Sequence, residues 1–173
     1  MKIPHIPTKT LLLIAVVAAI TLALSMGISV LLSRYHNLHV PSIGTIYALG
    51  VEAYGGDITY QNGTQRIDWG TVYIGTSTNR SVYIRSRSNI PTTLNLAIAN
   101  LTFEDAQANP AEPPNGSYVQ LAWNYDNSTV TPNQEMYVTL TLSISYDSNF
   151  INYLITNQIS NFSFDIRIYP PQP

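Results

Sequence analysis

The feature that most constrains this chain is an apolar run over residues 11–32 that contains no charged side chain. At about 22 residues it has the length of a helix that spans a bilayer, where backbone polar groups must be satisfied within the helix. A cleaved secretory signal has an apolar region of only about 7–15 residues. The run here continues past Ala23 and Met26 to Leu32. The sequence therefore predicts an uncleaved transmembrane signal anchor that contacts membrane lipid.

The rest of the chain has the size of one domain. About 140 residues remain beyond the run and its N-terminal flank, enough for a full hydrophobic core. We expect a flank at residues 1–10, the anchor at 11–32, an interfacial tether at 33–42 and one domain at 43–173. The chain has no cysteine, which excludes disulfides, thiolate metal sites and a cysteine nucleophile.

The distribution of charge predicts the orientation in the membrane. Lys2 and Lys9 precede the apolar run and Arg34 follows it, while all 10 carboxylates lie between Glu52 and Asp165. Positive residues flank the cytoplasmic end of a membrane helix more often than the other end. We expect a single-pass protein of the cell membrane with a cytoplasmic N-terminus and an extracytoplasmic domain.

Matches to the N-glycosylation acceptor pattern favour the same orientation, because that pattern has meaning only on an exported surface. Some matches arise by chance in a chain so rich in Asn, Ser and Thr. The candidate glycosylation sites are Asn62, Asn79, Asn100, Asn115, Asn127 and Asn161.

Beyond the tether, the hydrophobic period changes from helical to two. Residues 136–146 alternate apolar and polar side chains over eleven positions, the signature of a strand that buries one face. Further strands are expected at residues 43–54, 66–69, 80–88, 93–103, 119–125 and 162–169. In the strand at 93–103 the apolar residues change from even to odd positions near Asn100, which predicts a bulge there. Asp147 or Ser148 can cap a short helix before the last strand.

About seven strands, separated by glycine- and proline-containing turns, predict an all-β fold of two packed sheets. The absence of long helices between strands argues against a parallel α/β sheet. Trp69 and Trp123 have the parity of core side chains.

The segment from Ile67 to Ser77 carries a family resemblance. Trp69-Gly70, Gly75 and the Asn89-Ile90-Pro91 turn, together with the strands around them, resemble an immunoglobulin-like family related to the abnormal-spindle, SPD-2 and hydin domains. They are more similar still to archaeal cell-surface proteins with one N-terminal membrane helix. The resemblance covers nearly all of the exported part and implies a single immunoglobulin-like β-sandwich. It implies no chemistry, because this sandwich supports many roles.

Candidate catalytic residues are few. A serine or threonine nucleophile needs a base within hydrogen-bond reach, and the histidines outside the flank are His36 and His39 in the tether. These two could pair on a metal, yet no third ligand lies nearby, and His5 lies in the flank. Lysine is absent after Lys9. We expect no enzyme activity, no cofactor and no metal site.

The acidic residues permit two weaker hypotheses. The candidates for a glycosidase-type carboxylate pair are Glu104, Asp105, Glu112 and Asp126. With Asn109 and Asn127 they could also form an oxygen-rich Ca²⁺ site, although the EF-hand spacing is missing. We interpret these acids as solvated loop residues.

The outward strand faces are rich in Tyr, Thr, Ser, Asn and Gln and poor in charge. A small basic stripe for phosphate or polysaccharide could come from Arg80, Arg85, Arg87 and Arg167, although the outward parity of the last three indicates a solvated face. A polar surface of low charge suits hydrogen bonding and stacking with glycans or flat protein neighbours.

These patterns predict a non-catalytic, glycosylated structural or adhesive module of the cell envelope, with protein or glycan partners and no nucleic-acid partner. Two alternatives remain open. Lys9 before a long apolar helix is also how type IV pilins begin, which would make the chain a subunit of a pilus-like filament. It could also be an accessory β-sandwich protein of an archaeal motility or secretion machine.

Overall fold

The computed structural model describes residues 9, 17–18, 20–22, 39–48 and 50–171, and the chain divides into two units, Met1–Leu38 and His39–Pro173. In the first unit the described residues are helical, and the Thr21 hydroxyl donates to the Val17 carbonyl oxygen at 2.9 Å. Most of the expected anchor at residues 11–32, and all of residues 33–38, lie outside the described residues. Among the residues described, no helix is long and apolar enough to cross a membrane.

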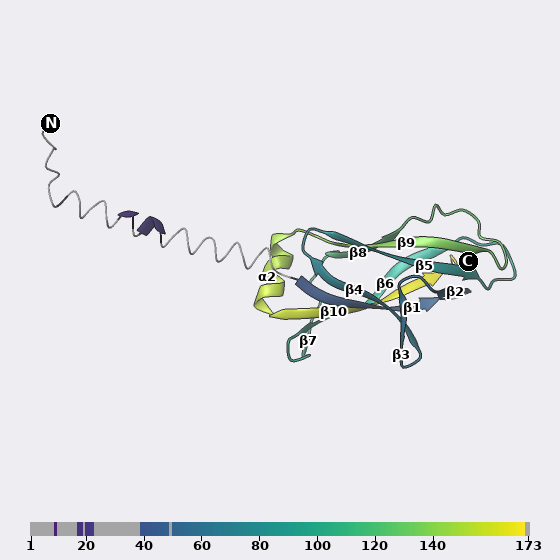
Figure 1. Cartoon of the computed structure of the whole chain (residues 1–173), viewed down its shortest axis with the longest axis horizontal. Coiled ribbons are helices and arrows are strands. Elements are labelled where there is room, and N and C mark those ends of the chain that lie inside the picture. Colours follow the sequence, from purple (N-terminus) through teal and green to yellow (C-terminus); the bar gives the residue numbers. More distant parts are fainter. Residues whose placement is uncertain (1–8, 10–16, 19, 23–38, 49, 172–173) are drawn as a thin grey trace, which may run out of the picture. The chain divides into compact units, whose positions relative to one another are not determined.

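The second unit is an all-β fold of two sheets with one short helix (Figure 1). The first sheet contains, in spatial order, β3 (Ile58–Gln61), β4 (Thr64–Tyr73), β1 (His39–Ala48), β10 (Ile159–Tyr169), β6 (Asn95–Asp105) and β7 (Pro110–Ala111). The second contains β2 (Val51–Tyr54), β5 (Ser77–Ser86), β9 (Glu135–Ile144) and β8 (Val119–Trp123). The helix α2 (Ser148–Thr156) lies at one end of the sheets.

Strand pairing brings the two ends of this unit together. β1 and β10 are parallel, with Ile46 opposite Ile166, and every other named strand pair is antiparallel. On its other side β1 pairs with β4 from His39 onward. Residues 39–42, expected in the tether, therefore belong to the first sheet.

The expected strand at residues 43–54 is two strands in different sheets. β1 ends at Ala48 in the first sheet and β2 begins at Val51 in the second, with Gly50 between them at a φ of 71°. A left-handed residue of this kind reverses the local chain direction at no Cβ cost when it is glycine. This crossing, the β3–β4 hairpin and the two-residue β7 raise the strand number above the expected seven.

The alternating apolar side chains meet between the sheets. Val138, Leu140, Leu142 and Ile144 of β9 are buried, as the period of two predicts. Trp69 is 1% exposed and stacks on Phe164 of β10, with ring centroids 6.2 Å apart. Trp123, expected in the core, is only half-buried because β8 is the outermost strand of its sheet.

Two local predictions are confirmed. Asn100 has a φ of 49°, and the register of β6 against β10 shifts between Ser163 and Asp165, so the bulge lies where the parity changes. Asp147 caps α2, its Oδ1 accepting from the backbone N–H groups of Asn149 at 2.8 Å and Phe150 at 3.1 Å. The apolar face of α2 closes that end of the core.

Candidate functional site

Two of the acidic candidates, Asp105 and Asp126, accept hydrogen bonds from their own loops. Asp105 accepts hydrogen bonds from the backbone of Gln107 and from the backbone and side chain of Asn109, each at 2.9 Å. The contacts from Asn109 hold the pKa of the Asp105 carboxyl below its usual value. Asp126 accepts from the Ser128 N–H at 2.9 Å, and contacts with Ser128 likewise lower its pKa. In the described part of the chain, no group of three or more His, Asp or Glu is placed to hold a metal ion.

The four arginines do not form a stripe. Arg80 points inward and donates to the carbonyl oxygens of Asp68 at 2.8 Å and Trp69 at 3.1 Å, which ties β5 to β4. Arg85 and Arg87 form ion pairs with Glu135 and Glu52. Arg167 belongs to β10 in the other sheet. Each cation of the second sheet is thus committed to a carbonyl or carboxylate.

The six acceptor asparagines fall into two groups. Asn62 lies in the tight β3–β4 turn, and Asn115 and Asn127 lie in loops, all three exposed. The others belong to strands: Asn79 accepts from the Thr141 hydroxyl at 2.9 Å, Asn100 donates to Asp165, and Asn161 has a buried Oδ1. The turn group is the more accessible to a modifying enzyme, because strand side chains are held by their neighbours.

Three tyrosines form an aromatic row across the outer face of the second sheet. Tyr54, Tyr83 and Tyr137, here called the tyrosine row, lie on β2, β5 and β9, with successive ring centroids 5.7 Å and 4.9 Å apart. Tyr83 is 41% exposed and Tyr137 is 57% exposed. Aromatic rings can stack on apolar faces while their hydroxyls stay in water, and this row lies on the solvent side of the sheet and not in the core.

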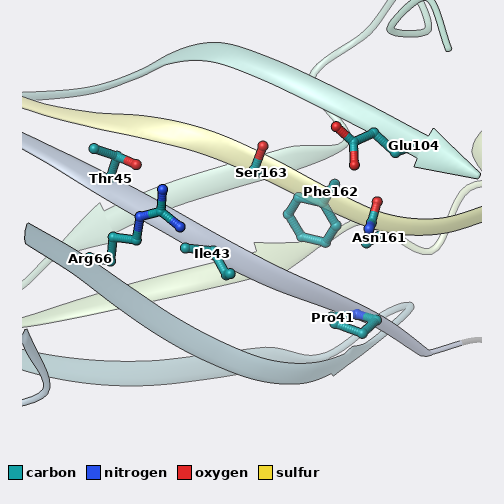
Figure 2. Close-up of a pocket in the computed structure, with 8 residues that line it drawn as sticks. All are labelled: Pro41, Ile43, Thr45, Arg66, Glu104, Asn161, Phe162 and Ser163. Atoms are coloured by element: carbon teal, nitrogen blue, oxygen red, sulfur yellow. The ribbon is translucent and has the colours of Figure 1, made fainter. Parts of the chain in front are cut away.

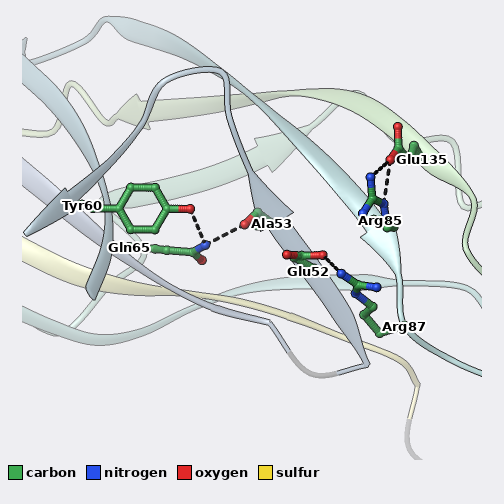
Figure 3. Close-up of polar contacts among 7 residues, drawn as sticks. All are labelled: Glu52, Ala53, Tyr60, Gln65, Arg85, Arg87 and Glu135. Atoms are coloured by element: carbon green, nitrogen blue, oxygen red, sulfur yellow. Dashed lines mark hydrogen bonds and ion pairs between the residues drawn. The ribbon is translucent and has the colours of Figure 1, made fainter. Parts of the chain in front are cut away.

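An ion pair fixes one edge of the row. The Arg85 guanidinium lies over the Tyr54 ring, 5.1 Å from its centroid. Its Nε donates to Glu135 Oε1 at 2.6 Å (Figure 3). The hydrogen bond from Arg85 and a contact from Tyr54 hold the pKa of Glu135 below its usual value, and burial followed by Glu135 raises the pKa of Tyr54. These contacts place an ion pair beside the row without adding net charge.

Beyond the row, the same face carries cross-strand pairs of hydroxyl and amide side chains. Ser81 pairs with Thr139 at 3.4 Å, Thr141 with Asn79 at 2.9 Å, and Ser77 with Ser143 at 2.8 Å. These hydroxyl and amide side chains carry no charge, and cross-strand pairs of this kind hold one another on the sheet face. The face can therefore stack and hydrogen-bond with a partner but offers no nucleophile–base pair.

The outer face of the first sheet contains a pocket of about 330 Å³, here called the sheet-face pocket (Figure 2). Its base is β1, which contributes Pro41, Ile43 and Thr45, and β10, which contributes residues 161–163. Arg66 of β4 stands on one side and Glu104 of β6 on the other. Four strands that are distant in sequence thus build one hollow.

Two buried polar atoms of this pocket are unsatisfied. Arg66 Nε and Asn161 Oδ1 are inaccessible to solvent, and neither has a hydrogen-bond partner within the described structure. Arg66 is held in place through Nη1, which donates to Gln61 Oε1 at 2.6 Å. A buried donor or acceptor without a partner costs about 1–3 kcal/mol, and neither atom faces the open space of the pocket.

The hairpin that carries Arg66 is itself anchored. Gln65 Nε2 donates to the Ala53 carbonyl oxygen at 2.8 Å and to the Tyr60 hydroxyl at 3.2 Å, which ties the β3–β4 hairpin to β2 (Figure 3). This contact joins the hairpin of the first sheet to the edge of the second. The wall of the sheet-face pocket is therefore preorganised.

Sequence reasoning identified the polar outer faces but missed both the tyrosine row and the pocket. The sequence predicts that Arg66, Thr45 and Asn161 point outward from their strands. That they line one pocket depends on the order of the strands in the sheet. Comparison with protein-family models gives no match for this chain, and a search of the curated proteins also finds none.

Proposed function

We propose that the chain is a membrane-tethered, extracytoplasmic structural or adhesive module of the cell envelope, and that it is non-catalytic. The observation that carries the proposal is the outer face of the second sheet, with its exposed tyrosine row and its uncharged hydroxyl pairs. Such a face suits stacking and hydrogen bonding with an envelope glycan or a flat protein neighbour.

The anchor is the second element of the proposal. It rests on the uncharged run at residues 11–32 and on the helical state of its described residues, among which Val17, Ile20 and Leu22 are each more than half exposed. An uncharged apolar helix of this length is stable in lipid. With Lys2 and Lys9 inside, the β unit lies on the outer side.

We also infer that the two-sheet fold is an immunoglobulin-like β-sandwich, related to the archaeal surface proteins that the Trp69-Gly70 segment resembles. The placement of Trp69 against Phe164 supports a structural role for that segment. The commitment of Asp105 and Asp126 to loop hydrogen bonds supports a role without catalysis.

Protease treatment of intact, wall-stripped cells tests the topology. We expect digestion of the β unit and survival of a membrane-protected fragment of little more than residues 1–32. Lysed cells with both membrane faces open are the control, in which the flank is also lost. Full protection of the β unit in intact cells would place it in the cytoplasm and refute the proposal.

Glycan mapping by mass spectrometry on protein from its native host gives a graded prediction. Asn62, Asn115 and Asn127 are exposed in turns and loops and should carry glycans at high occupancy. Asn100 and Asn161 should be modified less, because their side chains are engaged or partly buried. Equal occupancy at all of these positions would contradict the accessibility argument.

A double substitution of the tyrosine row tests the adhesive role. Tyr83→Ser with Tyr137→Ser removes both exposed rings and keeps hydroxyls, so retention of envelope material on the immobilised protein should fall. Tyr146→Ser, at a 79% exposed tyrosine outside the row, is the control. Retention by the double variant equal to that by Tyr146→Ser would exclude the row as the contact surface.

A further inference from the structure

We propose that the sheet-face pocket binds one neutral sugar residue. The pocket has a volume of about 330 Å³, which is at the lower end of small-molecule pockets and suits a single ring. This inference depends on the proposed function for one point, namely that envelope glycans are the source of the sugar. The pocket lies on the first sheet and is separate from the tyrosine row of the second.

Its hydrogen-bonding groups match a hydroxyl. Arg66 brings a guanidinium, a donor group, from β4, and Asn161 brings an amide, which can donate and accept, from β10. A sugar hydroxyl has two acceptor lone pairs and one donor, so hydroxyls at different positions of one ring suit the different walls of the pocket. The Thr45 and Ser163 hydroxyls line the same hollow and add contacts that can either donate or accept.

The charges select a neutral ligand. Arg66 and Glu104 line opposite sides of the pocket, and their opposite signs leave no net charge for an anion or a cation. An acidic sugar would gain from Arg66 but would bring its carboxylate toward Glu104, and like charges disfavour each other at short range. A neutral ring escapes this repulsion and still hydrogen-bonds to both walls.

The base of the pocket is apolar. Ile43 is 39% exposed on β1, and Pro41 lies beside it along the same strand face. A sugar ring presents C–H groups on one face, and burial of that face against Ile43 removes apolar surface from water. A pocket that combines an apolar base with a few convergent polar groups is typical of small-molecule sites.

Ligand-observed NMR on the full-length protein tests the inference. The protein is made in a bacterial host without N-glycosylation and kept in a detergent without a sugar headgroup, so that neither can occupy the pocket. The probes are methyl β-glucoside, N-acetylglucosamine and glucuronate. We expect saturation transfer from the protein to the two neutral sugars with a Kd of about 1 mM, and weaker transfer to glucuronate.

Variants locate the binding. Arg66→Ala and Asn161→Ala each remove one polar side chain of the lining and should weaken neutral-sugar binding about tenfold. Arg167→Ala, on the same face of β10 but outside the pocket lining, is the matched control and should bind as the parent does. Thr45→Tyr fills the hollow from an outward position and provides a second test if Asn161→Ala does not fold.

Two results would overturn the inference. One is no transfer to any of the three sugars, and the other is equal transfer in the parent, Arg66→Ala and Thr45→Tyr. A preference for glucuronate that Arg66→Ala abolishes would overturn the neutral-ligand assignment. None of these results bears on the protease test, so the pocket and the envelope topology can fail separately.

Discussion

Truncation of Trp69 to alanine is the sharpest test of the core. The side chain is 1% exposed and packs on Phe164, and a buried Trp removes roughly 150–250 Å² from water. At about 25 cal/mol per Å² this area corresponds to roughly 4–6 kcal/mol, and measured Trp→Ala losses in cores are about 3–5 kcal/mol. The indole N–H has no hydrogen-bond partner in the described structure, so the loss is almost entirely one of packing.

We therefore expect Trp69→Ala to lower the free energy of unfolding by about 4 kcal/mol. For a unit of this size the midpoint of thermal unfolding should fall by roughly 10–15 °C. Far-UV circular dichroism of the full chain in detergent, followed with temperature, measures the change. Trp69→Phe should lose much less, because it keeps an aromatic ring against Phe164 and removes the unpaired buried donor.

Trp123 provides the internal comparison. It lies half-buried on the outer strand β8, in edge contact with Tyr125, so Trp123→Ala should cost only about 1–2 kcal/mol. A Trp69→Ala variant that melts within about 2 °C of the parent would refute the placement of Trp69 in the core. A larger loss for Trp123→Ala than for Trp69→Ala would refute the burial ranking as well.

Three further substitutions probe separate contacts. Gly44→Ala places a Cβ 2.9 Å from Ile166 Cδ1 and 3.0 Å from the buried indole, so overpacking should lower stability by about 1–3 kcal/mol, read from the denaturant midpoint. Glu135 has a lowered pKa, so its pairing with Arg85 stabilises the fold above the usual carboxyl pKa and is lost as pH falls through the folded value. The melting difference between the parent and Glu135→Gln should accordingly be present at neutral pH and close in acid. Asp147→Ala removes the N-cap of α2 and should cost about 1 kcal/mol in the same melting assay.

The two outer faces divide the proposed roles of the molecule. The second sheet presents aromatic rings and paired hydroxyls on its outer face, while the first sheet holds a hollow lined by polar and apolar side chains. An open sheet face is suited to extended contact, and a hollow to one small group. The experiments above address each face with its own control.

The sequence by itself determined the local elements of this fold. Alternation over residues 136–146 predicted β9 and its buried side, because a strand that covers a core must place every second side chain inward. The parity change predicted the bulge at Asn100, and Asp147 before an apolar helical pattern predicted the cap of α2. These signals are local because each depends on a few consecutive residues.

Only the tertiary structure decided which strands are neighbours. The crossing at Gly50 separates β1 from β2, the parallel pairing of β1 with β10 joins the two halves of the first sheet, and the outer position of β8 leaves Trp123 half-buried. The sheet-face pocket follows from the same strand order, since Arg66 and Asn161 lie on the two strands that flank β1 although they are far apart in sequence. The alternation of apolar and polar residues indicates which way a side chain points. Its neighbours depend on the register between strands that are distant in sequence, and no local pattern contains that information.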